Sequence, residues 1–145
     1  MLPTSNFSSK KPYRSLLAGA SMGLLALTIS QTAAAITTKN VTYTVDNQAY
    51  EGYYAKADKP YAPFILLIHD WDGLTDYERK RADMLANEGY NVLAADMFGQ
   101  GIRPTSVEEN KRLTGELYDD RNKMRRILQG ALNAGRLEGN DVRNG

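Results

Sequence analysis

The spacing of hydrophobic and polar residues changes along this chain, and each spacing predicts a different element. Apolar and polar residues alternate from 41 to 45, which is typical of a half-buried strand. Asp46-Asn47 predicts a turn, and residues 49–55 then return as a second strand. The folded part is therefore expected to begin with an antiparallel hairpin.

Two short continuous apolar runs follow the hairpin, at Phe64–Ile68 and Tyr90–Ala95. Such runs are typical of parallel strands that are covered on both faces of a sheet. Between them, Thr-Asp-Tyr-Glu at 75–78 has the form of a capping box that starts a helix, and Gly89 is placed to end that helix. Strand, helix and strand predict an α/β fold, in which the hairpin leads into a mostly parallel sheet flanked by helices.

Two further helices are expected after the second apolar run. Met97–Pro104 contains glycines and a proline, and it predicts a loop. Ser106 begins a short helix by the same capping logic, and Asp119 or Asp120 begins a longer helix that reaches about Leu137. The apolar residues of the longer helix share one face and are expected to point inward: Met124, Ile127, Leu128, Ala131 and Leu132.

Polar residues follow directly after both apolar runs. His-Asp-Trp-Asp-Gly occupies 69–73, and Asp96 ends the second run. In open α/β sheets the ligand crevice lies beyond the carboxyl ends of the strands, so these residues are the first candidates for chemistry. His69 is the only histidine, and no neighbour in the sequence would tune it for proton transfer. A structural role is therefore favoured for His69, with hydrogen bonds to nearby backbone that hold the loop shape.

The acidic residues at these strand ends allow an alternative. Asp70, Asp72 and Asp96 are three carboxylates that could hold Mg²⁺. Asp-x-Asp-Gly after a buried strand is also similar to the haloacid dehalogenase signature, in which Asp70 would be the nucleophile and Asp72 the acid. That family usually has Thr or Val where Leu74 stands, and it does not begin with a hairpin. A magnesium-dependent phosphatase is thus one alternative, and a non-enzymatic α/β binding module is another.

The beginning of the chain has the layout of a secretory signal. Three basic residues precede the apolar stretch 15–29, and small residues at 32–35 allow cleavage after Ala35. We expect residues 1–35 to be a signal peptide, the protein to be periplasmic or secreted, and no stable membrane anchor to persist after cleavage. A G-x-S-x-G pattern at 19–23 lies inside this segment, without the strand, turn and helix that a nucleophile elbow needs.

The composition of the remaining part, residues 36–145, narrows the classes of function that it can have. Removing the three basic residues of the signal segment leaves 15 Lys and Arg against 17 Asp and Glu, a net charge of −2. A nucleic-acid partner is not expected, because there is no basic surplus. The chain has no cysteine, so it holds neither a disulfide framework nor a thiol nucleophile. About 110 residues allow one small domain with a modest core.

The residues from His69 to Tyr77 resemble the dienelactone hydrolase family of α/β-hydrolases, which commonly has His-Glu-x-x-Gly-Leu at this strand end. The likeness spans about residues 40–142, and it continues through these positions: Arg81-Ala82, Leu85-Ala86, Gly89-Tyr90, Asp96-Met97, Gly101 and Arg103-Pro104. It implies that residues 36–145 are the amino-terminal part of an α/β-hydrolase domain. It also implies a hydrolase acting on a small-molecule ester or lactone through an acyl-enzyme, without a metal or organic cofactor, and a monomer when complete.

The same resemblance implies roles for individual residues. The backbone N–H of Trp71 falls where the family has one donor of its oxyanion hole, and Asp70 falls on the acidic residue that contacts the resting nucleophile, usually Glu. Arg103 lies on a loop that borders the substrate pocket, while His69 and Gly73 support the site structurally. The family's nucleophile, usually Cys in G-x-C-x-G, would follow Gly145, with its triad Asp and His further on. We therefore expect the 145-residue chain to be inactive alone.

Overall fold

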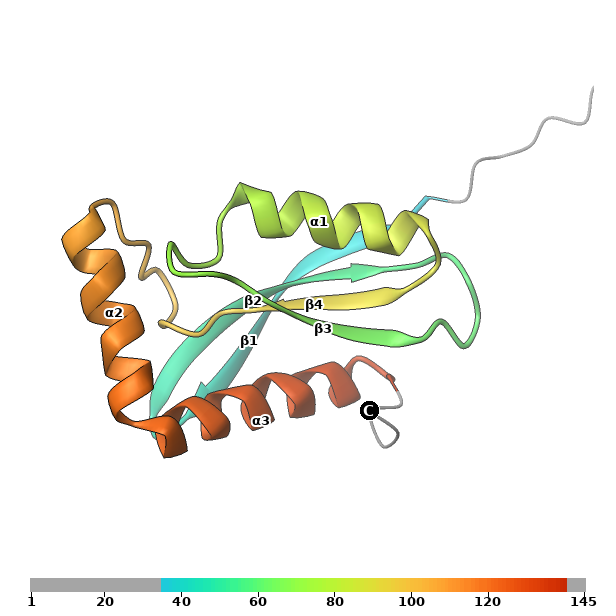
Figure 1. Ribbon diagram of the computed structural model, residues 1–145. Coiled ribbons are helices and arrows are strands. Elements are labelled where there is room, and N and C mark those ends of the chain that lie inside the picture. Colours follow the sequence, from blue (N-terminus) through green and yellow to red (C-terminus); the bar gives the residue numbers. More distant parts are fainter. Residues whose placement is uncertain (1–34, 141–145) are drawn as a thin grey trace, which may run out of the picture. The chain divides into compact units, whose positions relative to one another are not determined.

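The computed structural model describes residues 35–140 of the chain (Figure 1). The strands are β1 (Thr37–Val45), β2 (Gln48–Lys56), β3 (Phe64–Ile68) and β4 (Asn91–Ala95). The helices are α1 (Asp76–Asn87), α2 (Val107–Asp119) and α3 (Arg121–Leu137). The strands form one sheet in the order β1-β2-β4-β3, which confirms the predicted α/β class. Except for Ala35, the predicted signal peptide and its G-x-S-x-G pattern lie outside the described residues.

The predicted hairpin is confirmed. β1 and β2 pair antiparallel from Thr37 opposite Lys56 to Val45 opposite Gln48. The turn between them places Asp46 at φ 50° and Asn47 at φ 63°. Two successive residues with positive φ are typical of the tight turn that matches the right-handed twist of paired strands, and Asn and Asp tolerate that conformation. A local turn therefore sets the register of the first two strands.

β3 and β4 differ in burial although both are apolar runs. β4 lies between β2 and β3, pairing antiparallel with β2 and parallel with β3. Val92 to Ala95 are each 0% exposed. β3 lies at the edge of the described sheet, so its residues are half-buried and Ile68 is 44% exposed. The expectation that Phe64–Ile68 is buried like Tyr90–Ala95 is wrong for the described chain, because strand order decides burial and composition does not.

Two helices cover the opposite faces of the sheet (Figure 1). α1 packs Ala82 and Ala86 on one face, together with residues of β2 and β4. α3 packs on the other face, where Ile127 and Ala131 are fully buried, as its apolar pattern predicted. Gly135 lets α3 approach the sheet closely, because a Cβ at this position would lie 2.5 Å from the Phe64 ring. Both helix layers therefore cover the β4 region.

The helix starts follow the sequence signals closely. The Thr75 side chain caps α1, and the Glu78 carboxylate accepts a hydrogen bond from the Thr75 backbone N–H, so the predicted capping box is present. Ser106 caps α2, but the Glu109 carboxylate accepts a hydrogen bond from the Thr105 backbone N–H and not from that of Ser106, so the reciprocal bond of a capping box is absent. The helix has 13 residues and is longer than predicted. Asp120 caps α3. Within residues 35–140, no helix is long and apolar enough to span a lipid bilayer.

Candidate active site

The loop after β3 borders a cavity of about 270 Å³ at the carboxyl ends of the parallel strands. Three residues that the sequence singled out, His69, Asp70 and Trp71, belong to its wall. The remaining wall comes from the end of β3, the loop after β4, and helices α2 and α3: Ile68, Met97, Phe98, Thr114, Leu117, Tyr118 and Met124. The cavity therefore lies where open α/β sheets bind their ligands.

His69 is a buried connector between the two strand-end loops. Its Nε2 accepts a hydrogen bond from the backbone N–H of Met97 at 3.1 Å, so the ring proton is on Nδ1. That Nδ1–H donates to the carbonyl oxygen of Asp70 at 2.6 Å. The Phe98 ring contacts the imidazole edge-on, with 4.7 Å between centroids. Both ring nitrogens of His69 are thus engaged with backbone, the arrangement expected from a loop-holding residue.

The His69 hydrogen bond fixes one particular peptide unit. The carbonyl of Asp70 and the N–H of Trp71 belong to the same planar trans peptide, so they point in opposite directions. With the carbonyl turned toward His69, the N–H of Trp71 is turned away from the imidazole. Trp71 is in a turn and not in a helix, and its residue borders the cavity with 44% of its surface exposed. The predicted oxyanion donor is therefore on a rigid peptide beside a cavity.

Asp70 and Asp72 form a carboxylate pair on this loop. The N–H of Asp72 donates to Oδ1 of Asp70 at 3.3 Å. A hydrogen bond between the two side chains lowers the pKa of Asp70 from its ordinary value, and the backbone N–H groups of Asp72 and, to a smaller extent, Trp71 lower it further. The same side-chain bond raises the pKa of Asp72. The pair therefore favours the ionised form of Asp70 and disfavours that of Asp72.

Gly73 is required by the shape of the loop. Its φ is +88°, in the region that favours glycine. A Cβ on this residue would also lie 3.2 Å from the ring of Phe98, which contacts His69. Gly73 thus lets the β3 loop pass close to the β4 loop.

Asp96 holds the loop after β4 and does not face the cavity. Its carboxylate is fully buried, and it accepts 3.1 Å hydrogen bonds from the backbone N–H groups of Glu51, Phe98 and Gly99. The hydroxyl of Tyr43 donates to the Asp96 carbonyl at 2.6 Å, and burial raises the pKa of that phenol. Asp96 is therefore a structural anchor that the sequence signal could not distinguish from a site residue.

The geometry does not support a magnesium site. Both Asp96 carboxylate oxygens are used by backbone N–H groups, so Asp96 does not join Asp70 and Asp72 as a ligand. Among residues 35–140 there is no group of three or more His, Cys, Asp or Glu side chains that could hold a metal ion. The haloacid dehalogenase alternative therefore has no metal-binding arrangement in the described part of the chain.

Arg103 lies on the Asp96 side of the site. Its Nη1 is 3.7 Å from Oδ1 of Asp96, and it donates to the carbonyls of Gly99 and Ile102 at 3.4 and 2.7 Å. It does not belong to the wall of the 270 Å³ cavity. A role for Arg103 in binding substrate stays a prediction, and in this structure its guanidinium is turned to its own loop.

The sequence reasoning did not find the α2 side of the cavity. Thr114, Leu117 and Tyr118 share a helix face and close the wall opposite the β3 loop. Their spacing of three and four residues marks one face of α2, but the sequence does not say what that face covers. Only the packing of α2 at this end of the sheet makes them site residues.

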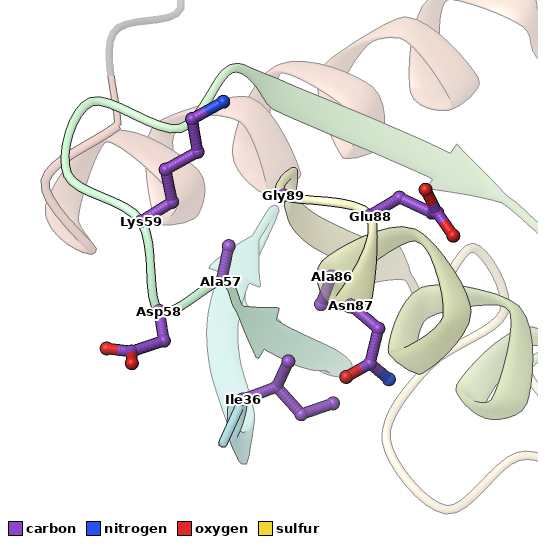
Figure 2. Close-up of a pocket in the computed structure, with 8 residues that line it drawn as sticks. All are labelled: Ile36, Ala57, Asp58, Lys59, Ala86, Asn87, Glu88 and Gly89. Carbon is purple, nitrogen blue, oxygen red and sulfur yellow. The ribbon is translucent and has the colours of Figure 1, made fainter. Parts of the chain in front are cut away.

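A second recess of about 240 Å³ lies at the C-terminal end of α1 (Figure 2). It is lined by Ile36, Ala57, Asp58, Lys59, Ala86, Asn87, Glu88 and Gly89. Its charged side chains are exposed to solvent, and it contains none of the residues that the sequence singled out for chemistry. The cavity beside Trp71 is therefore the better candidate for an active site.

Comparison with known proteins agrees with this geometry. The model of the dienelactone hydrolase family matches residues 50–142, from β2 to just beyond α3. The chain belongs to the dienelactone hydrolase family. The match includes the whole loop from His69 to Gly73, so the family resemblance and the cavity concern the same residues.

Solved dienelactone hydrolase structures share the fold. The structure named m3DLH is 27% identical to this chain, with a TM-score of 0.65. The alignment covers 69% of this chain and 42% of the m3DLH chain. A second structure, the dienelactone hydrolase-like promiscuous phosphotriesterase P91 from metagenomic libraries, is 30% identical, with a TM-score of 0.63. This alignment covers 69% of this chain and 42% of the P91 chain. No curated protein matches the chain. The chain thus aligns with less than half the length of these two structures.

Proposed function

We propose that this chain is the oxyanion-side part of an exported dienelactone hydrolase-type enzyme that cleaves ester or lactone bonds through an acyl-enzyme. In this proposal the Trp71 N–H binds the developing oxyanion, and a nucleophile outside the described residues attacks the carbonyl. One observation carries it: His69 fixes the Asp70–Trp71 peptide at the edge of a cavity at the strand ends. The substrate is a small uncharged or weakly charged ester, and no cofactor takes part.

The value of such a donor lies in its rigidity. A hydrogen-bond donor that already points at the position where charge develops needs no reorganisation during the reaction, and it contributes about 3 to 4 kcal/mol in acyl transfer. The hydrogen bond that Asp70 carbonyl accepts from His69 also polarises the peptide, which makes the Trp71 N–H a stronger donor. His69 is therefore a positioning residue in this proposal.

Asp70 has a separate part in the proposal. It is exposed and the Asp72 side chain lowers its pKa, so it presents an anion at the cavity. An anion at this place can accept a hydrogen bond from a resting hydroxyl or thiol nucleophile. Asp is one methylene shorter than the family's usual Glu, so this contact requires a nucleophile close to the β3 loop.

A segment exchange tests the proposal directly. Residues 50–142 of this chain replace the matching segment of the P91 phosphotriesterase, and hydrolysis of p-nitrophenyl butyrate is measured. The exchanged enzyme is expected to hydrolyse the ester. Trp71→Pro, which deletes the backbone N–H, should lower kcat by a factor of about 100 to 1,000, whereas Trp71→Phe, which keeps it, should retain most activity.

Three results would count against the proposal. Equal activity of the proline and phenylalanine variants would show that the Trp71 N–H is not an oxyanion donor. Turnover of p-nitrophenyl butyrate by the 145-residue chain alone, lost in Asp70→Ala, would show that the chain has its own nucleophile. Hydrolysis of p-nitrophenyl phosphate that EDTA abolishes would favour the magnesium-dependent alternative.

A further inference from the structure

We propose that the side chains of Trp71 and Tyr118 form an aromatic site that binds the ring of an aryl substrate. The inference deepens the proposed function and rests on it, because it takes the 270 Å³ cavity as the substrate site. It assigns a substrate class: uncharged esters with one benzene ring bonded to the ester group. The sequence analysis considered Trp71 only for its backbone N–H and did not single out Tyr118.

The first argument is that two large aromatic side chains are left uncovered at one cavity. Trp71, on the loop after β3, is 44% exposed, and Tyr118, on α2, is 62% exposed. Single exposed aromatic residues are common on proteins, but these two share a wall. Aromatic side chains bury a large apolar area when they are covered, so a ligand that contacts both gains hydrophobic stabilisation from each.

The second argument is that both aromatic side chains have interactions that restrict their movement. The peptide that leads into Trp71 is fixed by the hydrogen bond between His69 and the Asp70 carbonyl. The Arg121 guanidinium lies over the Tyr118 ring, with 5.9 Å to its centroid, and interacts with the π face. Side chains that are already restrained lose less conformational entropy when a ligand binds. The two aromatic side chains are therefore suited to binding although they are exposed.

The third argument is the chemistry of the neighbouring wall. Phe98 contributes another aromatic ring, and Met97 and Met124 contribute thioether side chains. Aromatic rings attract one another in offset or edge-to-face contacts, and sulfur also contacts aromatic rings favourably. A saturated ring of the same size gains the hydrophobic contribution without these interactions. The wall therefore favours an aromatic ring over an aliphatic one.

The size of the cavity limits the ligand to a small one. A closed apolar cavity of about 150 Å³ is enough to hold benzene. The cavity beside Trp71 has about 270 Å³, so it has room for one benzene ring and an ester group. This size favours a substrate with a single ring.

The polar groups that a ligand can reach favour an uncharged substrate. Asp70 is exposed and is the one carboxylate in the part of this wall that the structure describes, so it repels an anionic ligand. Thr114 Oγ1 and, one turn earlier on α2, Asn110 Oδ1 have no hydrogen-bond partner among the described residues. Both of these atoms are enclosed by the protein, so a ligand in the cavity does not bond to them.

Ligand binding to the full 145-residue chain tests the inference without requiring turnover. The main probes are acetophenone and cyclohexyl methyl ketone, which carry the same acetyl group on a six-membered ring and differ in whether that ring is aromatic. NMR follows binding through the indole N–H signal of Trp71 and the methyl signals of Met97 and Met124. Met84 lines a separate apolar groove and reports binding there, and the exposed Thr42 on β1 is the reference.

Acetophenone should bind about tenfold more tightly than cyclohexyl methyl ketone, because it gains an aromatic contact with each of the two side chains. A third probe, 4-acetylbenzoate, adds a carboxylate to the aromatic ring. It should bind more weakly than acetophenone, because Asp70 repels it.

Variants connect the preference to the two aromatic side chains. Tyr118→Leu removes one ring and should lower the preference for acetophenone to about threefold, whereas Tyr118→Phe should retain it. Trp71→Leu keeps the backbone N–H, removes the other ring and should lower the preference to the same extent. Tyr77→Leu is the matched control, since Tyr77 is 58% exposed, has Arg81 over its ring at 5.0 Å, and lines the groove of Met84. It should leave the preference unchanged.

The outcomes separate this inference from the proposed function. Equal binding of acetophenone and cyclohexyl methyl ketone, or an unchanged preference in Tyr118→Leu or Trp71→Leu, would overturn the aromatic site and leave the proposed function standing. Tightest binding of 4-acetylbenzoate would overturn the uncharged substrate class. Shifts at Met84 without shifts at Met97 and Met124 would overturn the inference, because the probes would then bind in the other groove.

The proposed function can also fail while the inference holds. Equal ester hydrolysis by the Trp71→Pro and Trp71→Phe forms of the exchanged enzyme would overturn the oxyanion role of the backbone N–H. A tenfold preference for acetophenone that depends on Tyr118 would still support the aromatic site.

Discussion

Two loops leave the carboxyl ends of neighbouring parallel strands, and each places an aspartate beside the strand end. After β4, Asp96 is 0% exposed and its carboxylate bonds three backbone N–H groups. After β3, Asp70 is exposed, shares a hydrogen bond with Asp72, and borders a cavity. The same residue type at equivalent ends of the sheet thus has two surroundings: one aspartate holds structure, and the other borders the cavity that we propose as the substrate site.

The difference follows from the position of each strand in the sheet. β4 is internal, so its end is enclosed by the hairpin and by its own loop, and a carboxylate there must find partners in the protein. β3 is the edge strand of the described sheet, so its end is open and its carboxylate can stay hydrated. His69 joins the two regions, since it takes a hydrogen bond from Met97 in one loop and gives one to Asp70 in the other.

The largest expected effect comes from removing the Asp96 carboxylate. Asp96→Ala leaves three backbone N–H groups without their acceptor, and it should lower the free energy of unfolding by about 3 kcal/mol. Asp70→Ala is the matched control and should change it by less than about 0.5 kcal/mol, because an exposed carboxylate is lost. Urea denaturation of both variants measures the difference. Similar losses in the two variants would contradict the division of tasks.

The connection between the loops is broken by His69→Ala. This change removes two neutral hydrogen bonds and leaves the Met97 N–H buried without a partner, so we expect a loss of about 2 kcal/mol in unfolding free energy. The fluorescence of Trp71, the only tryptophan, should shift because its peptide is released. Phe98→Leu keeps both hydrogen bonds and should leave the Trp71 emission unchanged. A shift in that control as large as in His69→Ala would show that ring packing holds the loop.

A pair of glycines, one in each loop, sharpens the comparison. Gly73 has φ +88° and a Cβ there would meet the Phe98 ring, whereas Gly101 has φ +78° and open space around it. Gly101→Ala should cost about 1 kcal/mol for the backbone conformation alone. Gly73→Ala should cost about 1.5 kcal/mol, because the ring must also move. Thermal unfolding measures both, and equal costs would mean that the two loops are not in tight contact at Gly73.

The smallest expected effect concerns the protonation of Asp70 and Asp72. The shared hydrogen bond places the pKa of Asp70 below the ordinary value of 3.8 and that of Asp72 above it. The lowered Asp70 pKa stabilises the fold above 3.8, and this contribution is lost as pH falls through the folded-state pKa. The raised Asp72 pKa stabilises the fold below 3.8, and its contribution is lost as pH rises through the folded-state pKa. The two contributions oppose each other, so stability should change little.

Carbon NMR titration of the two carboxyl groups measures this pair. Asp72→Ala should move the Asp70 pKa up toward 3.8, and Asp70→Ala should move the Asp72 pKa down toward 3.8. Wild-type midpoints that coincide, or variants that leave them unmoved, would show that the side chains do not share a proton.

Local signals in the sequence determined the elements of this protein. The turn at Asp46-Asn47, the capping box at Thr75 and the cap at Asp120 each depend on groups within a few residues, so spacing alone predicted them. The same holds for the run of polar residues after Phe64–Ile68, which located the candidate site and, through its likeness to the dienelactone hydrolase family, the fold.

Only the tertiary structure decided what these elements do. The burial of β4 and the half-exposure of β3 depend on strand order, and the role of Asp96 depends on the Glu51 amide, 45 residues earlier in the chain. Thr114 lines the candidate site because α2 lies at this end of the sheet. Hydrogen bonds and cavity walls join residues that are distant in sequence, and spacing along a chain does not encode which distant groups meet.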